Sequence, residues 1–272
     1  MRHCIRESDF VLIVEDLCVS YEDNKVLKNF ELTINQSEIV AIVGESGSGK
    51  STAIRAIFSL LSNKGKITEG NIVFEGESLI DKSDNEWNCI RGKKISMVFQ
   101  DSGAMLSPIR KIKSQLIEYV RIHSNMSKKE AYKKCINMLR STNLTDPERV
   151  MNSYPFQLSG GMKQRVGIAI AMMFKPKLLL ADEPTSALDA TTQKQIVEEM
   201  MNLRDKDGTS IVIVTHNLGV AAYMADKIIV MKDGKIIEVG SATNVINMPK
   251  HKYTKELINT VPDLERREKC LC

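Results

Sequence analysis

Residues 44–51, Gly-Glu-Ser-Gly-Ser-Gly-Lys-Ser, decide the fold class of this chain. They follow the apolar run Ile39–Val43 and precede Ser51–Leu61, a segment with helical character. A glycine-rich turn between a buried strand and a helix matches the phosphate-binding pattern G-x-x-x-x-G-K-S/T. The stretch therefore predicts an α/β protein of the P-loop type, which binds a nucleotide.

Each residue type in this loop suits a triphosphate. Glycines let the backbone wrap closely around phosphate oxygens, and the helix that follows adds N–H groups and its positive dipole end. Lys50 supplies a point charge for the β- and γ-phosphates, and the Ser51 hydroxyl can ligate Mg²⁺. A chance Gly/Ser loop is the bland alternative, and the strand and helix on either side count against it.

An acidic pair, Asp182 and Glu183, ends the apolar run Leu178–Ala181. Catalytic groups of open α/β sheets lie beyond the carboxyl ends of the strands. Asp182 is expected to hold Mg²⁺, and Glu183 to polarise an attacking water. An acidic pair alone is often only part of a solvated turn. Together with a phosphate loop in the same chain, it indicates that the bound nucleotide is hydrolysed.

A second glycine-rich segment, Leu158–Arg165, opens a long predicted helix. A polar helix N-terminus of this kind suits an anion, although Ser159 is equally suited to a plain helix N-cap. Further polar residues stand at strand ends or just past the acidic pair, in a fixed order around the two glycine-rich segments: Tyr21, Gln100, Asp189 and His216.

Strand-like and helical segments alternate along the chain, which predicts an α/β fold with a mainly parallel sheet. The expected strands are Phe10–Val14, Cys18–Tyr21, Phe30–Ile34, Ile39–Val43, Asn71–Phe74, Ile95–Phe99, Leu178–Ala181, Ile211–Val214 and Ile228–Met231. The expected helices include Ser51–Leu61, Ser159–Phe174, Thr191–Asp207, Leu218–Ala225, Ala242–Met248 and Tyr253–Val261. Residues 109–149 contain no strand pattern, and a capping box at Ser127–Glu130 starts a helix there.

The composition of the chain excludes or disfavours several classes of function. The chain has 272 residues, and 38 basic against 34 acidic residues leave a net charge of +4, too small by itself to indicate nucleic acid. The longest apolar stretch, Val166–Phe174, is too short to span a bilayer, and the first residues lack a signal-peptide core. We expect a cytoplasmic chain. The terminal pair Cys270 and Cys272 supplies too few ligands for a tetrahedral metal site.

The motif order closely resembles that of the ATP-binding subunits of ABC transporters, with Leu158–Arg165 as their signature motif. The resemblance covers about Val11 to Gly240. It implies an ABC ATPase domain over residues 1–240, with a mainly parallel core sheet and a small antiparallel β subdomain. It also implies a helical subdomain inserted at about 101–157 and a short helical tail at 241–272.

The resemblance also implies a role for each motif position. Glu183, His216, Gln100 and Lys50 are the expected catalytic residues. The expected Mg²⁺ ligands are Ser51, Gln100 and Asp182. The expected nucleotide-binding residues are Tyr21, Gly44, Glu45, Ser46, Gly47, Ser48, Gly49, Lys50, Ser51, Thr52, Ser159, Gly160, Gly161 and Asp189. In this scheme Tyr21 stacks on adenine, and Ser159 and Gly161 cap the γ-phosphate bound to the other ATPase subunit.

An ATPase subunit of this kind binds ATP and Mg²⁺ and drives import through separate membrane permease subunits. It would lie at the cytoplasmic face of the membrane, paired with a second ATPase. A sister chain is favoured over an identical copy, and an extracytoplasmic binding protein would act indirectly. Residues 154–166 and 249–257 are similar to dipeptide, oligopeptide and nickel importers, so peptides are the expected cargo and nickel or a nickel chelate is the alternative.

Two other classes of protein fit the sequence less well. ABC ATPases that act on nucleic acid bring coiled-coil arms, zinc modules or two ATPase domains, whereas this sequence has one phosphate loop and no heptad run. A small GTPase or kinase would leave Leu158–Arg165 unexplained, and the guanine-reading Asn-Lys-x-Asp motif is missing.

Overall fold

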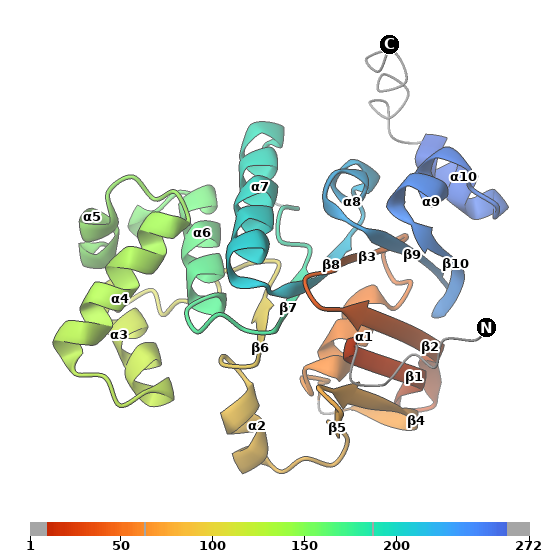
Figure 1. The fold of residues 1–272 in the computed structure, drawn as a ribbon, viewed down its shortest axis with the longest axis horizontal. Coiled ribbons are helices and arrows are strands. Elements are labelled where there is room, and N and C mark those ends of the chain that lie inside the picture. The colour runs from red at the N-terminus through yellow and green to blue at the C-terminus, as the bar shows by residue number, and fades with distance from the viewer. Residues whose placement is uncertain (1–9, 63, 187, 260–272) are drawn as a thin grey trace. The chain divides into compact units, whose positions relative to one another are not determined.

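The structure, a computed structural model, describes residues 10–62, 64–186 and 188–259 (Figure 1). Within these, the chain forms two units. The first joins the residues up to Asp84 with those from Ser210 onward, and the second consists of Asn85–Thr209. The terminal cysteines Cys270 and Cys272 lie outside the described residues.

An antiparallel sheet forms one part of the first unit. Its strands are β1 (Phe10–Tyr21), β2 (Asn24–Asn35), β4 (Gly65–Phe74) and β5 (Glu77–Ser78), in the order β2-β1-β4-β5 (Figure 1). The expected strands at 10–14 and 18–21 are one strand, because Asp16 takes a left-handed φ of 47° at a register shift instead of turning the chain. The antiparallel sheet implied by the family resemblance is confirmed.

Parallel strands form the other part of the first unit. Strand β3 (Ile39–Val43) lies between β8 (Ser210–Thr215) and β9 (Lys227–Lys232) and runs parallel to both, while β10 (Lys235–Ser241) pairs antiparallel with β9. Every residue of β3 and β8 is buried, as expected of strands covered on both faces.

The helices of the first unit are α1 (Lys50–Ile57), α8 (Leu218–Met224), α9 (Ala242–Asn247) and α10 (Lys252–Asn259). The prediction that α1 reaches Leu61 is wrong. The helix ends because Ser59 leaves the helical conformation with a left-handed φ of 53°, and its N–H donates to the carbonyl oxygen three residues back, that of Ala56, at 3.0 Å. The prediction for α10 extends to Val261, which lies outside the described residues.

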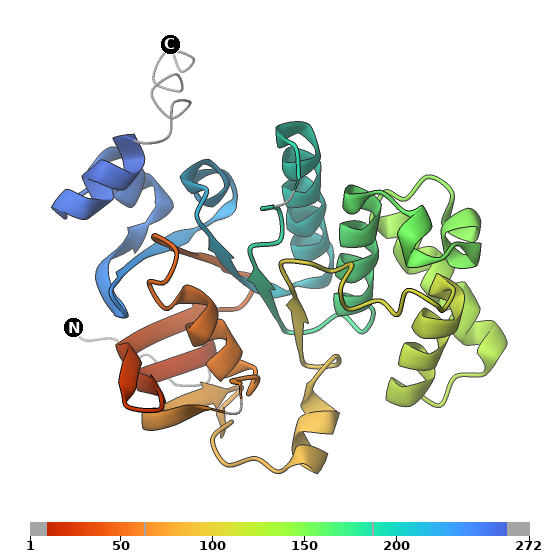
Figure 2. The same cartoon turned by 180° about the vertical axis from the view of Figure 1, so that it is seen from behind.

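The second unit contains two parallel strands and most of the helices, seen from behind in Figure 2. The strands are β6 (Ile95–Val98) and β7 (Leu178–Asp182). The helices are α2 (Asp84–Ile90, which begins at the end of the first unit), α3 (Ile112–His123), α4 (Lys128–Ser141), α5 (Pro147–Asn152), α6 (Gly160–Ala171) and α7 (Ala190–Asp207), with a 3-10 turn at Pro155–Gln157.

The apolar faces of α3, α4, α5 and α6 share one core, whose members include Ile112, Leu116, Leu139, Val150 and Val166. The capping box predicted for α4 is confirmed, since the Glu130 N–H donates to Ser127 Oγ and the Ser127 N–H donates to Glu130 Oε2. The Ser127 hydroxyl also donates to Glu130 Oε2 at 2.7 Å, and this bond, followed by that from the Ser127 N–H, lowers the pKa of Glu130. The subdomain boundaries at 101–157 and 241–272 stay predictions.

Helices α2 and α5 and strand β10 were not anticipated from the sequence. Each is short, at seven, six and seven residues. Segments of this length give too few turns or alternations for a clear hydrophobic period. In the described part of the chain, no helix is long and apolar enough to cross a bilayer.

Candidate nucleotide site

The phosphate loop and His216 follow neighbouring strands of the first unit. Val43 at the end of β3 pairs in register with Thr215 at the end of β8. Gly44 and His216 are therefore the next residues at the same carboxyl edge, and His216 is exposed there. Ligand sites of α/β sheets lie beyond such edges.

The structure explains why two positions of the loop are glycines. A Cβ on Gly44 would lie 2.2 Å from the carbonyl oxygen of Met231 on β9, so no side chain fits. Gly49 is the N-cap of α1 with a φ of 95°, and it offers no side-chain acceptor to the helix. Because no side chain caps it, the first turn of α1 is well placed to donate N–H groups to an anion.

The ammonium group of Lys50 lies inside the phosphate loop. Its side chain is buried, and Nζ donates to the carbonyl oxygens of Gly44 at 2.8 Å and Glu45 at 2.7 Å. Carbonyl dipoles of the loop itself thus hold the ammonium at the centre of the loop, where a phosphate would meet it.

Two segments from the C-terminal part of the first unit brace the loop. The Gly234 N–H, in the turn between β9 and β10, donates to the Ser48 carbonyl oxygen at 3.2 Å. The Glu45 N–H donates to the phenol oxygen of Tyr253 on α10 at 3.0 Å. Sequence reasoning gave Tyr253 no role, although it lies in the tail segment 249–257 that resembles the importers.

Tyr21 ends β1 and is half-buried. Gly65 lies against its ring, where an added Cβ would be 2.7 Å from Tyr21 Cε1. The predicted loop residues Glu45, Ser46 and Gly47 are exposed, as a ligand-facing segment requires.

The acidic pair and Gln100 follow the two strands of the second unit. Val98 on β6 pairs with Ala181 on β7, so Gln100 and Asp182 lie near the same edge. Asp182 is 3% exposed. Glu183 has a left-handed φ of 45°, a conformation that costs a non-glycine residue on the order of 1–3 kcal/mol. Strain of this kind is frequent at functional sites.

Two predicted site residues are helix N-caps in the second unit. Ser159 Oγ accepts the Met162 N–H of α6 at 3.3 Å. Asp189 accepts the Thr192 N–H at 3.0 Å and the Thr192 hydroxyl at 2.7 Å, and these bonds lower its pKa. The N-cap interpretation of Ser159 is confirmed, and its role toward a nucleotide stays a prediction. Gly160 is exposed, and a Cβ on Gly161 would lie 3.0 Å from Thr192 Cγ2.

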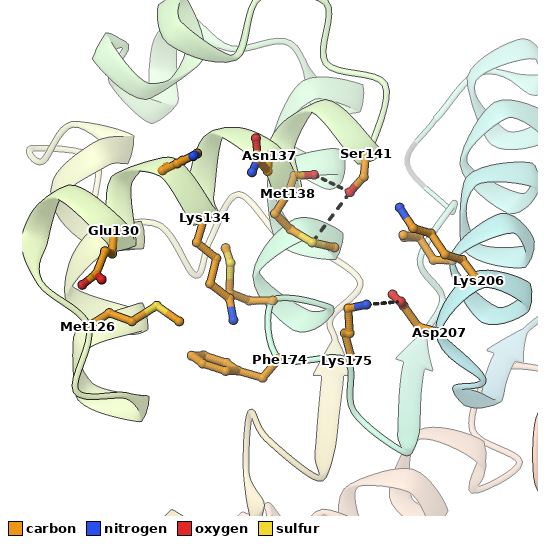
Figure 3. Close-up of a pocket in the computed structure, with 13 residues that line it drawn as sticks. Met126, Glu130, Lys134, Asn137, Met138, Ser141, Phe174, Lys175, Lys206 and Asp207 are labelled. Atoms are coloured by element: carbon orange, nitrogen blue, oxygen red, sulfur yellow. Dashed lines mark hydrogen bonds and ion pairs between the residues drawn. The ribbon is translucent and has the colours of Figure 1, made fainter.

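A cavity of about 540 Å³ in the second unit contains none of the predicted site residues (Figure 3). It lies among α4, the residues after α6 and the end of α7. Lys175 pairs with Asp207 at 2.8 Å, and the Lys134 ammonium lies 4.3 Å from the Phe174 ring centroid. The cavity therefore lies apart from the predicted nucleotide-binding residues.

The predicted residues thus form two sets. Tyr21, Gly44–Thr52 and His216 belong to the first unit, while Gln100, Ser159–Gly161, Asp182, Glu183 and Asp189 belong to the second. A glycine-rich loop between a buried parallel strand and an uncapped helix defines the class: a P-loop protein that binds nucleotide phosphates.

Comparisons with known proteins give the family within that class. Residues 27–186 match the ABC transporter family. The oligopeptide transport ATP-binding protein OppD of Bacillus subtilis is 41% identical over 94% of this chain and 73% of its own length. The dipeptide transport ATP-binding protein DppD of Lactococcus lactis is 40% identical over 94% of this chain and 74% of its own.

Comparison with solved structures gives the same family. The dimeric ATP-binding cassette MJ0796 bound to ADP and Pi has a TM-score of 0.76 at 34% identity, over 85% of this chain and 98% of its own. The chain cbiO1 of Clostridium perfringens, part of the transporter complex cbiONQ, has a TM-score of 0.76 at 27% identity, over 96% and 99% of the two chains. This chain belongs to the ABC transporter family and is an ATP-binding subunit that hydrolyses ATP.

Proposed function

We propose that this chain powers the uptake of peptides through separate membrane permease subunits, at the cytoplasmic face of the membrane. The observation that carries the proposal is the set of relatives named for oligopeptide or dipeptide transport, about 40% identical over almost the whole chain. Nickel or a nickel chelate is the second candidate, because the signature region and the tail also resemble nickel importers.

The test of cargo is deletion of this subunit, followed by uptake of labelled dipeptides, labelled oligopeptides and nickel in parallel. Loss of peptide uptake, restored by the wild-type chain but not by a Lys50→Ala chain, is expected. Loss of nickel uptake with peptide uptake intact would reverse the order of the two cargoes. If neither uptake changes, both assignments are wrong.

We infer that the phosphates lie on Gly44–Thr52 and that Tyr21 stacks on the adenine. The support is the uncapped start of α1, the buried Lys50 and the shared edge of β3 and β8. His216, at that edge, is assigned to the γ-phosphate. Buried Lys50 offers one charge at the loop centre, so it orients the β- and γ-phosphates and neutralises part of their charge.

Ser51, Gln100 and Asp182 are proposed to hold Mg²⁺. Hydroxyl, amide and carboxylate oxygens are the hard donors this ion takes, and Asp182 is a buried carboxylate at a strand end. When bound, the ion would offset negative charge on the phosphates. Glu183, next to Asp182, is proposed to take the proton from the attacking water.

We further propose a second ATPase subunit as partner, a sister chain in preference to an identical copy. Ser159, Gly160 and Gly161 would face the nucleotide of that partner, with Asp189 beside them, and an extracytoplasmic binding protein would deliver cargo. The net charge of only +4 does not favour nucleic acid as a partner.

Ser159→Arg tests the cross-subunit assignment in the assembled transporter, because the large cation would occupy the place of the partner's γ-phosphate. Site-resolved nucleotide trapping should show failure at the sister's site, while the isolated chain binds ATP normally. Failure only at the site built by this chain's own loop would refute the assignment. The conservative Ser159→Thr, which keeps the capping hydroxyl, serves as the control.

A further inference from the structure

The phosphate loop makes a contact with the tail that the motif pattern does not predict. The Glu45 N–H, at the second position of the loop, donates to the phenol oxygen of Tyr253 at 3.0 Å. This N–H is thereby directed toward α10. The contact lies wholly within the first unit.

Tyr253 is held in place by its own surroundings. Its side chain is only 4% exposed, and the Lys232 ammonium lies 4.6 Å from its ring centroid. Its N–H donates to His251 Nδ1 at 3.1 Å. A phenol fixed in this way can set the direction of a loop amide, whereas a mobile one could not.

A carboxylate on β10 anchors the start of α10. Glu238 accepts the Lys250 N–H at 2.8 Å and the His251 N–H at 3.0 Å. Desolvation alone would raise the pKa of Glu238, but these bonds, with the nearby His251 and Thr254 side chains, outweigh it and lower that pKa. The tail is thus tied to the same hairpin whose turn, at Gly234, donates to Ser48 of the loop.

The hydroxyl is what distinguishes this residue from a packing residue. A phenylalanine would fill the same buried space, but it would leave the Glu45 N–H without its acceptor. A tyrosine is protonated at neutral pH at its ordinary pKa of about 10, and burial raises the pKa of Tyr253 further, so the phenol is a neutral acceptor. An amide that loses its partner is free to rotate toward solvent, and the loop entrance then has more conformations to lose when nucleotide binds.

We propose that Tyr253 is a positioning residue of the nucleotide site: its phenol oxygen fixes the entrance of the phosphate loop, which makes α10 a structural part of that site. This inference rests on the proposed assignment of the phosphates to Gly44–Thr52. It gives the tail segment 249–257 a physical role in nucleotide binding.

The test compares Tyr253→Phe with Tyr223→Phe, a matched loss of a hydroxyl from α8 in the same unit. With the full-length chain, the dissociation constant of mant-ATP should rise about three- to tenfold in Tyr253→Phe and stay unchanged in Tyr223→Phe. In the assembled transporter, KM for ATP should rise by a similar factor while kcat stays within about twofold. Exchange of the Glu45 amide hydrogen should be faster.

The two proposals can fail separately. If Lys50→Ala binds mant-ATP as tightly as the wild type, the phosphate site itself is wrong. If Lys50→Ala loses binding while Tyr253→Phe keeps wild-type affinity and KM, only the role of Tyr253 is overturned. That role is also overturned if Tyr253→Phe lowers kcat at unchanged KM, or if Tyr223→Phe weakens binding equally. Unfolding temperatures without nucleotide check that the variants are folded.

Discussion

The two units treat their glycine-rich helix starts in opposite ways. In the first unit, α1 begins at Gly49 without a side-chain cap, and the loop before it is held by backbone and phenol contacts from Gly234 and Tyr253. In the second unit, α6 begins at Ser159, whose hydroxyl already caps Met162. The first start has no side-chain cap, and the second is capped by its own serine.

This difference suggests that the two units contribute differently to nucleotide affinity and to turnover. An uncapped, braced helix start with a buried lysine favours tight binding of phosphate in the same chain. We expect the self-capped helix and Glu183 to contribute little to holding the nucleotide, and Glu183 to act in its turnover. Substitutions in the phosphate loop of the first unit should therefore change affinity, while substitution of Glu183 should change the rate and substitution of Ser159 the stability.

The largest expected effect is that of Glu183→Gln. The amide keeps the shape of the side chain but cannot accept the proton of the attacking water, so ATPase turnover of the assembled transporter should fall about 10²- to 10⁴-fold. ATP affinity should stay unchanged. Turnover is measured by phosphate release and affinity by equilibrium binding. Near-normal turnover would remove Glu183 from the chemistry, and a large loss of affinity would break the comparison between the units.

Lys50→Ala should have the next largest effect, this time on binding. Loss of a charge-assisted contact to phosphate costs about 1.5–3 kcal/mol, or roughly 10- to 150-fold in ATP affinity. Equilibrium binding of mant-ATP to the full chain measures it. Lys194→Ala is the control, because the Lys194 side chain is 69% exposed and pairs only with Glu198, one turn along α7, among the ion pairs of the described residues. Equal affinities for the two variants would show that the loop is not the phosphate site.

Ser159→Ala sharpens the comparison by removing the cap from α6. The Met162 N–H loses its acceptor, and the free energy of unfolding should fall by about 1 kcal/mol, measured by denaturant unfolding. ATP affinity of the isolated chain should not change. Ser159→Gly should lose only a few tenths of a kcal/mol, because glycine is tolerated at N-caps. A weakened affinity in either variant would mean that α6 contributes to this chain's own binding site.

The smallest expected effect concerns the N-cap of α7. The hydrogen bonds from Thr192 lower the pKa of Asp189, so the ionised carboxylate stabilises the fold. That contribution is fully present above the unfolded-state pKa, near 4, and is lost as pH falls through the lower folded-state value. Asp189→Asn keeps an acceptor without the charge, so its stability should depend less on pH as the pH falls below about 4. Urea unfolding measures the slope, and identical slopes would exclude this linkage.

Some elements could be read from local sequence because a local cause produces them. The bounds of β3 match the apolar run Ile39–Val43, since a strand buried on both faces needs such a run. Helix α4 starts where Ser127 and Glu130 predict, because the capping box is a contact over three residues. The start of the helix after the phosphate loop was predicted to within one residue, but that helix ends at Ile57, well before the predicted Leu61.

By itself, the sequence determined the fold class, the family and the set of candidate site residues, because motifs such as Gly44–Ser51 act through spacing and residue type alone. Only the tertiary structure showed that Val43 aligns with Thr215, that Met231 excludes any side chain at Gly44, and that Tyr253 accepts the Glu45 N–H. Such contacts join residues up to 208 positions apart, and chain connectivity carries no information about which distant groups meet. They are decided by how the sheet and the tail pack, which is where the loop acquires its shape.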